Sequence, residues 1–159
     1  MKRIVFLCYP RMEHGVELNE RERQLIDEAM VQFDHHFKGC NQIHLATSTA
    51  QHAQKFSQAL GRRFQLAAYN KSSELHSDNG RRPTGAALSY VMVRFKPAEI
   101  LVVVTDSIFA TELLAQFCGK VLKLKLTTPS LTAGKMCMMD CETQQLHHLR
   151  PLTLEAISA

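Results

Sequence analysis

The sequence has no tryptophan, only 7 glycines and 5 prolines, and little excess charge of either sign. Its 19 Lys and Arg against 15 Asp and Glu leave a net charge of +4, short of the clustered positive charge typical of dedicated nucleic-acid-binding proteins. With 45% hydrophobic and 21% charged residues, the composition excludes disordered, collagen-like and coiled-coil chains. The length of 159 residues therefore predicts one globular domain over residues 1–159. The small net charge predicts no nucleic-acid partner.

The sequence also lacks a long hydrophobic run near its start. Met1-Lys2-Arg3 is followed by only five apolar residues, Ile4 to Cys8, before the chain turns polar. Such a run is too short for a signal peptide or a membrane span. It predicts a first β-strand, and we expect no membrane partner.

Cysteine and histidine patterns give no sign of a metal site. None of the five cysteines forms a Cys-x-x-Cys pair, and their odd number argues against a disulfide framework. The pairs His35-His36 and His147-His148 are adjacent in sequence, so they lack the i, i+4 spacing of zinc ligands on a helix. We expect no metal, no cofactor and a cytoplasmic location.

Apolar runs that suit buried strands alternate with segments of helical periodicity. The predicted strands cover 4–8, 43–47, 64–68 and 99–104. The predicted helices begin after Asn19, at Ser48 or Thr49, near Thr84 and after Asp106, and end near Gly39, at Gly61, before Pro97 and near Gly119. The segment Tyr69 to Arg82 is predicted to be a long loop.

Two local patterns sharpen this prediction. Asn19 with Glu22 three residues later is typical of a capping box at a helix start. In the last helix the spacing places Ile108, Leu113, Leu114 and Phe117 on the inward face.

The C-terminal part follows a different pattern. Residues 134–139 and 143–149 flank a polar turn and predict a β-hairpin. The complete pattern predicts an α/β fold, a three-layer sandwich in which a mostly parallel sheet with an antiparallel edge hairpin is flanked by helices.

Ligands of such sheets bind beyond the carboxyl ends of the strands. Three polar clusters occupy those positions: Tyr9-Pro10-Arg11, Thr47-Ser48-Thr49 with nearby His52, and Thr105-Asp106-Ser107. The chain contains neither a Gly-x-Gly-x-x-Gly motif nor a P-loop, so nucleotide binding by those routes is excluded.

With these segments the chain resembles the histidine phosphatase superfamily. The resemblance rests on the first strand, the helix start Leu18-Asn19-Glu20-Arg21, the segment 46–53 and the strand ending Thr105-Asp106, and it covers nearly the whole chain. The length and the hairpin ending Leu149-Arg150-Pro151 are most similar to the short branch of SixA-type phosphohistidine phosphatases related to phosphoglycerate mutase. The resemblance implies a phosphoglycerate mutase-like fold.

The chemistry of that family needs an Arg-His-Gly nucleophile segment, a second arginine and a late histidine. In this chain Tyr9-Pro10-Arg11 occupies the place of Arg-His-Gly, His52 falls where the second arginine belongs, and Asp106 replaces the late histidine. The helix start also lacks the family's glycine. Proline offers no nucleophile, and a carboxylate repels a phosphoryl anion.

Two further residues are candidates for catalysis. His14, in Glu13-His14-Gly15, could replace the lost nucleophile only if the end of the first strand bulges by four residues; otherwise it is a solvated loop histidine. Glu74 lies in the loop where related enzymes often place an acidic proton donor, although such a polar stretch is more often just a solvated loop.

The leading hypothesis is a bacterial, cytoplasmic, histidine-phosphatase-like pseudoenzyme that acts as a binding or regulatory module. Its expected partners are a phosphorylated or acidic protein or a small phosphorylated ligand. One alternative is an active phosphatase for phosphohistidine or a small phosphoester, with His14 as nucleophile and Arg11 as clamp. Another is a new chemistry with His52 and Asp106 as general base and orienting group.

Overall fold

The computed structural model describes residues 2–12, 15, 17–76 and 83–152. The strands are β1 (Arg3–Cys8), β2 (Ile43–Ser48), β3 (Ala68–Ser72), β4 (Ile100–Thr105), β5 (Met136–Asp140) and β6 (Gln145–Leu149). The α-helices are α1 (Glu20–Phe37), α2 (Gln51–Arg63), α3 (Gly85–Phe95) and α4 (Ser107–Gln116). A short 3-10 helix, η1 (Ser73–Leu75), follows β3, and a π-helical turn, η2 (Phe117–Val121), continues α4.

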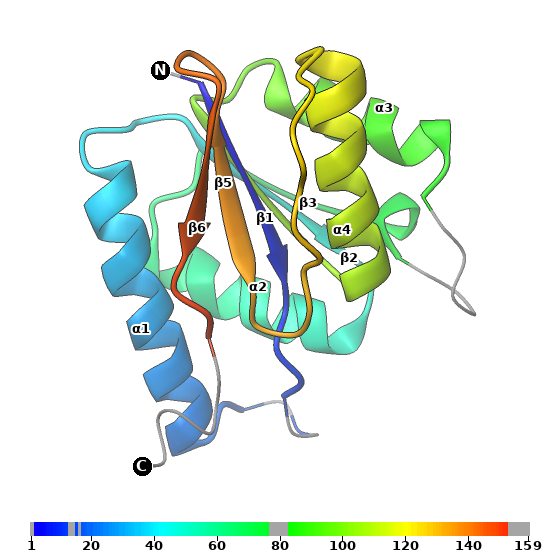
Figure 1. The fold of residues 1–159 in the computed structure, drawn as a ribbon. Coiled ribbons are helices and arrows are strands. Elements are labelled where there is room, and N and C mark those ends of the chain that lie inside the picture. Colours follow the sequence, from blue (N-terminus) through cyan, green and yellow to red (C-terminus); the bar gives the residue numbers. More distant parts are fainter. Residues whose placement is uncertain (1, 13–14, 16, 77–82, 153–159) are drawn as a thin grey trace.

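The six strands form one sheet in the order β3-β2-β4-β1-β5-β6 (Figure 1). The pairs β3 with β2, β2 with β4 and β4 with β1 are parallel. The hairpin of β5 and β6 joins antiparallel to β1. The predicted mostly parallel sheet with an antiparallel edge is therefore confirmed.

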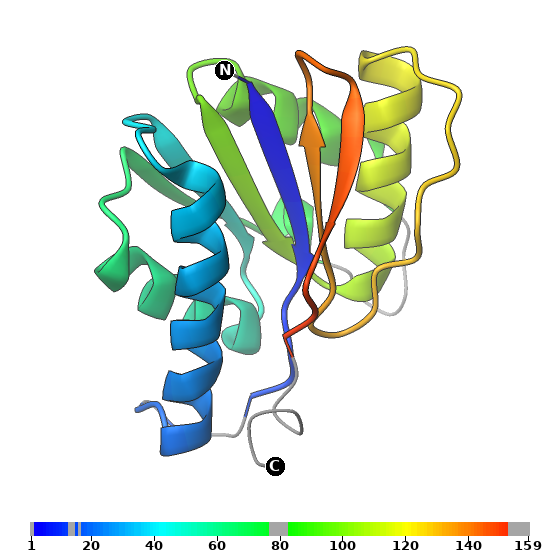
Figure 2. The ribbon, with the colours of Figure 1, turned by 60° about the vertical axis from the view of Figure 1, so that its left-hand side comes forward.

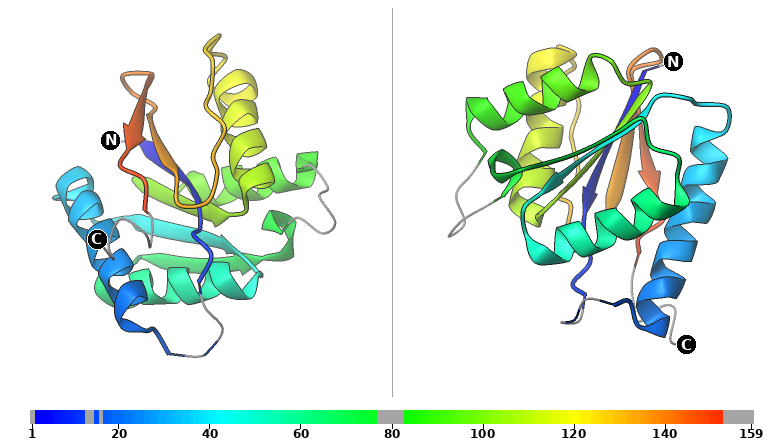
Figure 3. Two further views of the ribbon diagram at one scale, coloured as in Figure 1. Left: turned by 60° about the horizontal axis from the view of Figure 1, so that its bottom comes forward. Right: turned by 180° about the vertical axis from the view of Figure 1, so that it is seen from behind.

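Helices cover both faces of the sheet, which gives the predicted three layers (Figures 2 and 3). One core cluster joins α1 and α2 to alternate residues of the strands, with Phe33 and Phe56 fully buried. The other joins α3 and α4 to the opposite set of strand residues, with Leu114 and Phe117 fully buried. The central strands β1, β2 and β4 are buried along their whole length, as expected of strands covered on both faces.

The capping box that the sequence predicts at the start of α1 is present. The Glu22 amide donates to Asn19 Oδ1 at 2.8 Å, and the Asn19 amide donates to Glu22 Oε1 at 3.2 Å. These two bonds satisfy amides that have no partner within the helix, so they fix where α1 begins.

The prediction was wrong around the third strand. The structure places β3 at Ala68–Ser72, not at 64–68, so the start of the predicted loop is strand and 3-10 helix. The apolar residue Phe64 packs instead against the rings of Phe33 and Phe37, with centroid distances of 5.6 and 6.2 Å. The apolar side chain of Phe64 therefore reflects packing against α1 just before the edge strand β3, and not a strand at 64–68.

Two details of the helices also differ from the prediction. Helix α2 continues through Gly61 to Arg63, and a Cβ at Gly61 would lie only 3.3 Å from Leu66 Cδ1. This glycine therefore permits close packing and does not stop the helix. Ile108, predicted to face inward, is 37% exposed because it lies in the first turn of α4, at the margin of the sheet.

No helix in the described part of the chain is both long enough and apolar enough to cross a bilayer.

Candidate functional site

The three predicted clusters lie at one edge of the sheet, because β2, β4 and β1 are parallel and adjacent. The register pairs Cys8 with Thr105 and Thr47 with Val104. Ser48, Thr105 and Cys8 therefore end their strands at the same level. The segments that follow them, at the lower end of the β1 arrow in Figure 1, form the candidate site.

The first of these segments is Tyr9-Pro10-Arg11. The Tyr9 amide donates to the Thr105 carbonyl at 3.2 Å, so β1 continues along β4 without an inserted residue up to this point. Pro10 follows as a buried residue and Arg11 as an exposed one. The second residue beyond the strand is thus Pro10.

The segment after β4 brings a carboxylate to this edge. Asp106 is half-buried and caps α4, because its Oδ1 accepts a hydrogen bond from the Phe109 amide at 3.0 Å. Burial raises the pKa of the Tyr9 phenol, and the Asp106 carboxylate raises that pKa further. Burial and the same carboxylate raise the pKa of the Cys8 thiol to about 12. Both groups therefore stay protonated at neutral pH beside a negative charge.

The side chain of the predicted pocket residue Thr105 forms a hydrogen bond within the fold. It is fully buried, and its Oγ1 donates to the Leu75 carbonyl at 2.6 Å. This bond holds η1 against the end of β4. Glu74, the candidate proton donor, lies in η1 but is exposed, and its amide donates to Ser72 Oγ at 3.1 Å.

The segment after β2 differs in detail from the prediction. Helix α2 begins after Ala50 and has no side-chain cap, so neither Ser48 nor Thr49 is its N-cap. Ser48 is buried, and its Oγ accepts from the Ala50 amide at 3.1 Å, one residue before the helix. His52 lies in the first turn of α2 and is half-buried.

One contact near His52 was not predicted from the sequence. Lys55, one helical turn further along α2, donates to Glu22 Oε1 at 3.0 Å, and Glu22 is fully buried. A buried carboxylate requires such a partner. The pair locks the start of α1 onto α2, and only the capping role of Glu22 is visible in the sequence.

His14 lies outside the described residues, so its predicted role stays a prediction. Among the residues that the structure describes, no group of three or more His, Cys, Asp or Glu side chains is arranged to hold a metal ion.

Comparisons with known proteins agree on the fold. No family model matches the sequence, and no curated protein matches it closely enough to be counted a relative. Solved structures do match over nearly the whole chain. The protein histidine phosphatase SixA complexed with tungstate shares 12% identity, with a TM-score of 0.62 over 98% of this chain and 99% of that one.

Two other neighbours belong to the same group of folds. Phosphoglycerate mutase from Plasmodium falciparum shares 12% identity, with a TM-score of 0.54 over 94% of this chain and 89% of that one. A mycobacterial glucosyl-3-phosphoglycerate phosphatase shares 15% identity, with a TM-score of 0.53 over 96% and 99%. The chain therefore has the phosphoglycerate mutase-like fold.

Proposed function

We propose that this histidine-phosphatase-like protein has lost phosphoryl transfer and acts as a binding or regulatory module. The observation that carries the proposal is Pro10. It is the second residue beyond β1, where the family resemblance places the nucleophilic histidine, and the Tyr9 bond to Thr105 leaves no bulge before it. A proline ring has no atom that can accept a phosphoryl group.

The electrostatics of the strand ends support the same proposal. Phosphoryl transfer needs cations and hydrogen-bond donors around the phosphate. Here burial, and then the Asp106 carboxylate at the end of β4, raise the pKa of both Tyr9 and Cys8. A carboxylate about 4 Å from a phosphoryl charge costs roughly 4 kcal/mol at an effective dielectric constant near 20. This is about three decades of affinity.

The proposed partner is a phosphorylated or acidic group on a protein or a small molecule in the bacterial cytoplasm. Two features favour such a group despite Asp106. Helix α2 starts at this edge without a side-chain cap, and a helix start attracts negative charge. Arg11, which follows Pro10 after β1, is exposed. We therefore expect weak binding of an anion without its hydrolysis.

An assay with a phosphohistidine peptide and p-nitrophenyl phosphate tests the loss of catalysis. We expect no turnover by the purified protein, and the His14→Ala variant should behave identically. Turnover of about 1 per second or more that His14→Ala abolishes would contradict the proposal and establish the alternative, an active phosphatase with His14 as nucleophile.

Calorimetric titration with vanadate tests the binding role separately. Weak, saturable binding that Arg11→Ala reduces is expected. Binding that is absent from a folded protein, or unchanged in the variant, would mean that these strand ends do not receive an anion.

A further inference from the structure

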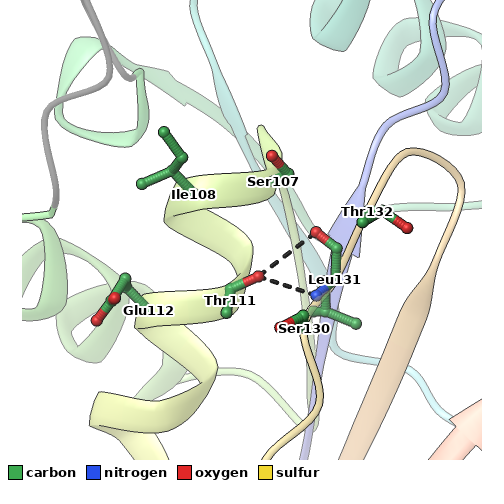
Figure 4. A pocket seen from close by; sticks show the side chains of 7 residues that line it. All are labelled: Ser107, Ile108, Thr111, Glu112, Ser130, Leu131 and Thr132. Atoms are coloured by element: carbon green, nitrogen blue, oxygen red, sulfur yellow. Dashed lines mark hydrogen bonds between the residues drawn. The ribbon is translucent and has the colours of Figure 1, made fainter.

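A groove runs beside the candidate site, between the first turns of α4 and the chain segment before β5. Its volume is about 470 Å³, which is within the range of small-molecule sites. Seven residues line it (Figure 4): Ser107, Ile108, Thr111, Glu112, Ser130, Leu131 and Thr132. Apart from Ser107, which directly follows Asp106, its lining residues lie outside the clusters at the strand ends.

Its wall is fixed by a side chain of α4. Thr111 Oγ1 accepts a hydrogen bond from the Leu131 amide at 2.9 Å and donates to the Leu131 carbonyl at 3.4 Å (Figure 4). Leu131 itself is 2% exposed and anchors the segment in the core. Because Thr111 forms both hydrogen bonds, the irregular segment around Leu131 is held at a constant distance from α4. The groove therefore exists before a ligand binds.

The rim of the groove carries hydroxyl groups. Ser107, Ser130 and Thr132 are exposed, and within the described residues their hydroxyls take no part in a hydrogen bond. Each hydroxyl can both donate and accept. Three such groups on two facing elements can therefore bind several hydroxyls of one ligand.

The rest of the lining offers an apolar surface and one carboxylate, Glu112, but no positive charge. Ile108 is 37% exposed at the groove, and no Lys, Arg or His belongs to the described lining. An anion would find no cation here, whereas a purely apolar ligand would leave the hydroxyls without new partners. The lining suits a ligand that is neutral, rich in hydroxyls and apolar on one face.

We propose that this groove binds a neutral sugar or cyclic polyol, with its C–H face on Ile108 and its hydroxyls bonded to Ser107, Ser130 and Thr132. The groove is open and has no aromatic lining residue among those described. We therefore expect a dissociation constant of about 1 to 10 mM. This site is independent of the proposed anion binding at the strand ends.

Titration of ¹⁵N-labelled protein with methyl α-D-glucopyranoside, D-ribose and myo-inositol, followed by amide chemical shifts, tests the proposal. Saturable shifts should be confined to the first two turns of α4 and to residues 130–132. The double variant Ser107→Ala/Ser130→Ala should bind about threefold to tenfold more weakly for each lost hydrogen bond. The matched control is Ser89→Ala, which removes an exposed serine hydroxyl from α3 and should change nothing.

Two comparison ligands distinguish the proposed site for a neutral ligand from an anion site and from a purely apolar groove. Tighter binding of glucose 6-phosphate at the same amides would overturn the proposal in favour of an anion site. Equal binding of cyclohexanol would overturn it in favour of a purely apolar groove. Absence of saturable shifts with all three neutral compounds, or shifts elsewhere on the protein, would also refute it, whatever the vanadate titration shows.

Discussion

Lys2 and Arg3 are neighbours at the start of the first strand, yet they cap helices on opposite faces of the sheet. Lys2 Nζ donates to the carbonyls of Phe95, Lys96 and Ala98 at 2.8, 2.7 and 2.6 Å, at the end of α3. Arg3 donates to the His36 carbonyl at the end of α1. Alternation of side chains along an extended chain sends two consecutive cations to two helix ends, where positive charge is favourable.

Replacing either cation should therefore destabilise the protein. Lys2→Met and Arg3→Met retain much of the aliphatic side chain but remove the hydrogen bonds to the helix ends, and we expect each to cost about 1 to 3 kcal/mol of the free energy of unfolding. Urea denaturation measures the loss. Lys120→Met, at an exposed position, should stay within about 0.5 kcal/mol. A variant that matches this control would show that its cation does not support a helix.

The two core clusters should respond independently to truncation. Phe33 and Leu114 are both fully buried, one in each cluster. Phe33→Ala and Leu114→Ala should each cost roughly 2 to 5 kcal/mol. In the double variant the losses should add, because the sheet separates the two sites. Denaturant titration of all three proteins checks this. Losses under about 0.5 kcal/mol would contradict the packing of α1 or α4.

Stability should rise with pH around the ordinary histidine range. Burial lowers the pKa of His44 from 6.5, and the Lys2 charge lowers it further; burial also lowers that of His36, with added effects from His35, Arg3 and His147. Below 6.5 the unfolded chain therefore binds more protons than the folded protein, so the free energy of unfolding falls as the solution is acidified through this range.

Urea denaturation at pH 5.5 and 7.5 measures this dependence. The double variant His36→Gln/His44→Gln should show a smaller difference between the two pH values than the parent. An unchanged difference would mean that other groups carry the pH dependence.

Removing the charge at the end of β4 should strengthen anion binding without restoring catalysis. Asp106→Asn keeps the oxygen that accepts from the Phe109 amide but removes a negative charge, so vanadate should bind at least about tenfold more tightly. Adding His52→Arg introduces a guanidinium that can grip two oxygens and should raise the affinity again.

Calorimetry with vanadate, alongside the phosphatase assay, measures both effects. Asp34→Asn, at an exposed position on α1, is the control for net charge. Turnover should stay absent because Pro10 remains. Equal affinities of the parent and Asp106→Asn would place the carboxylate outside the anion's reach.

The sequence predicted most of this fold because its signals are local. A five-residue apolar run and a following Tyr-Pro pair locate β1 and its end, and the Asn19 and Glu22 side chains locate the start of α1. Strand β3 escaped prediction for a physical reason. It is an edge strand with alternating half-buried and exposed residues, while the more apolar segment before it packs on α1.

The site could be predicted only as a set of strand ends. That Thr105 holds Leu75 in place, or that Glu22 is buried against Lys55, depends on residues about thirty positions apart, which no local pattern connects. The groove beside α4 depends on Thr111 and Leu131 in the same way. Composition and spacing identify the elements, whereas the contacts between them decide which side chains meet.

The central position of β1 also constrains how the chain acquires its site. Among the strands of this sheet β1 is synthesised first, but its neighbours in the sheet are β4 and β5, so Arg3 can pair with Ile100 and Asp140 only after those residues have been made. Pairings between such distant segments form late because closing the intervening loop costs entropy. Tyr9 and Pro10, although made early, can take their places only when nearly the whole domain has been synthesised.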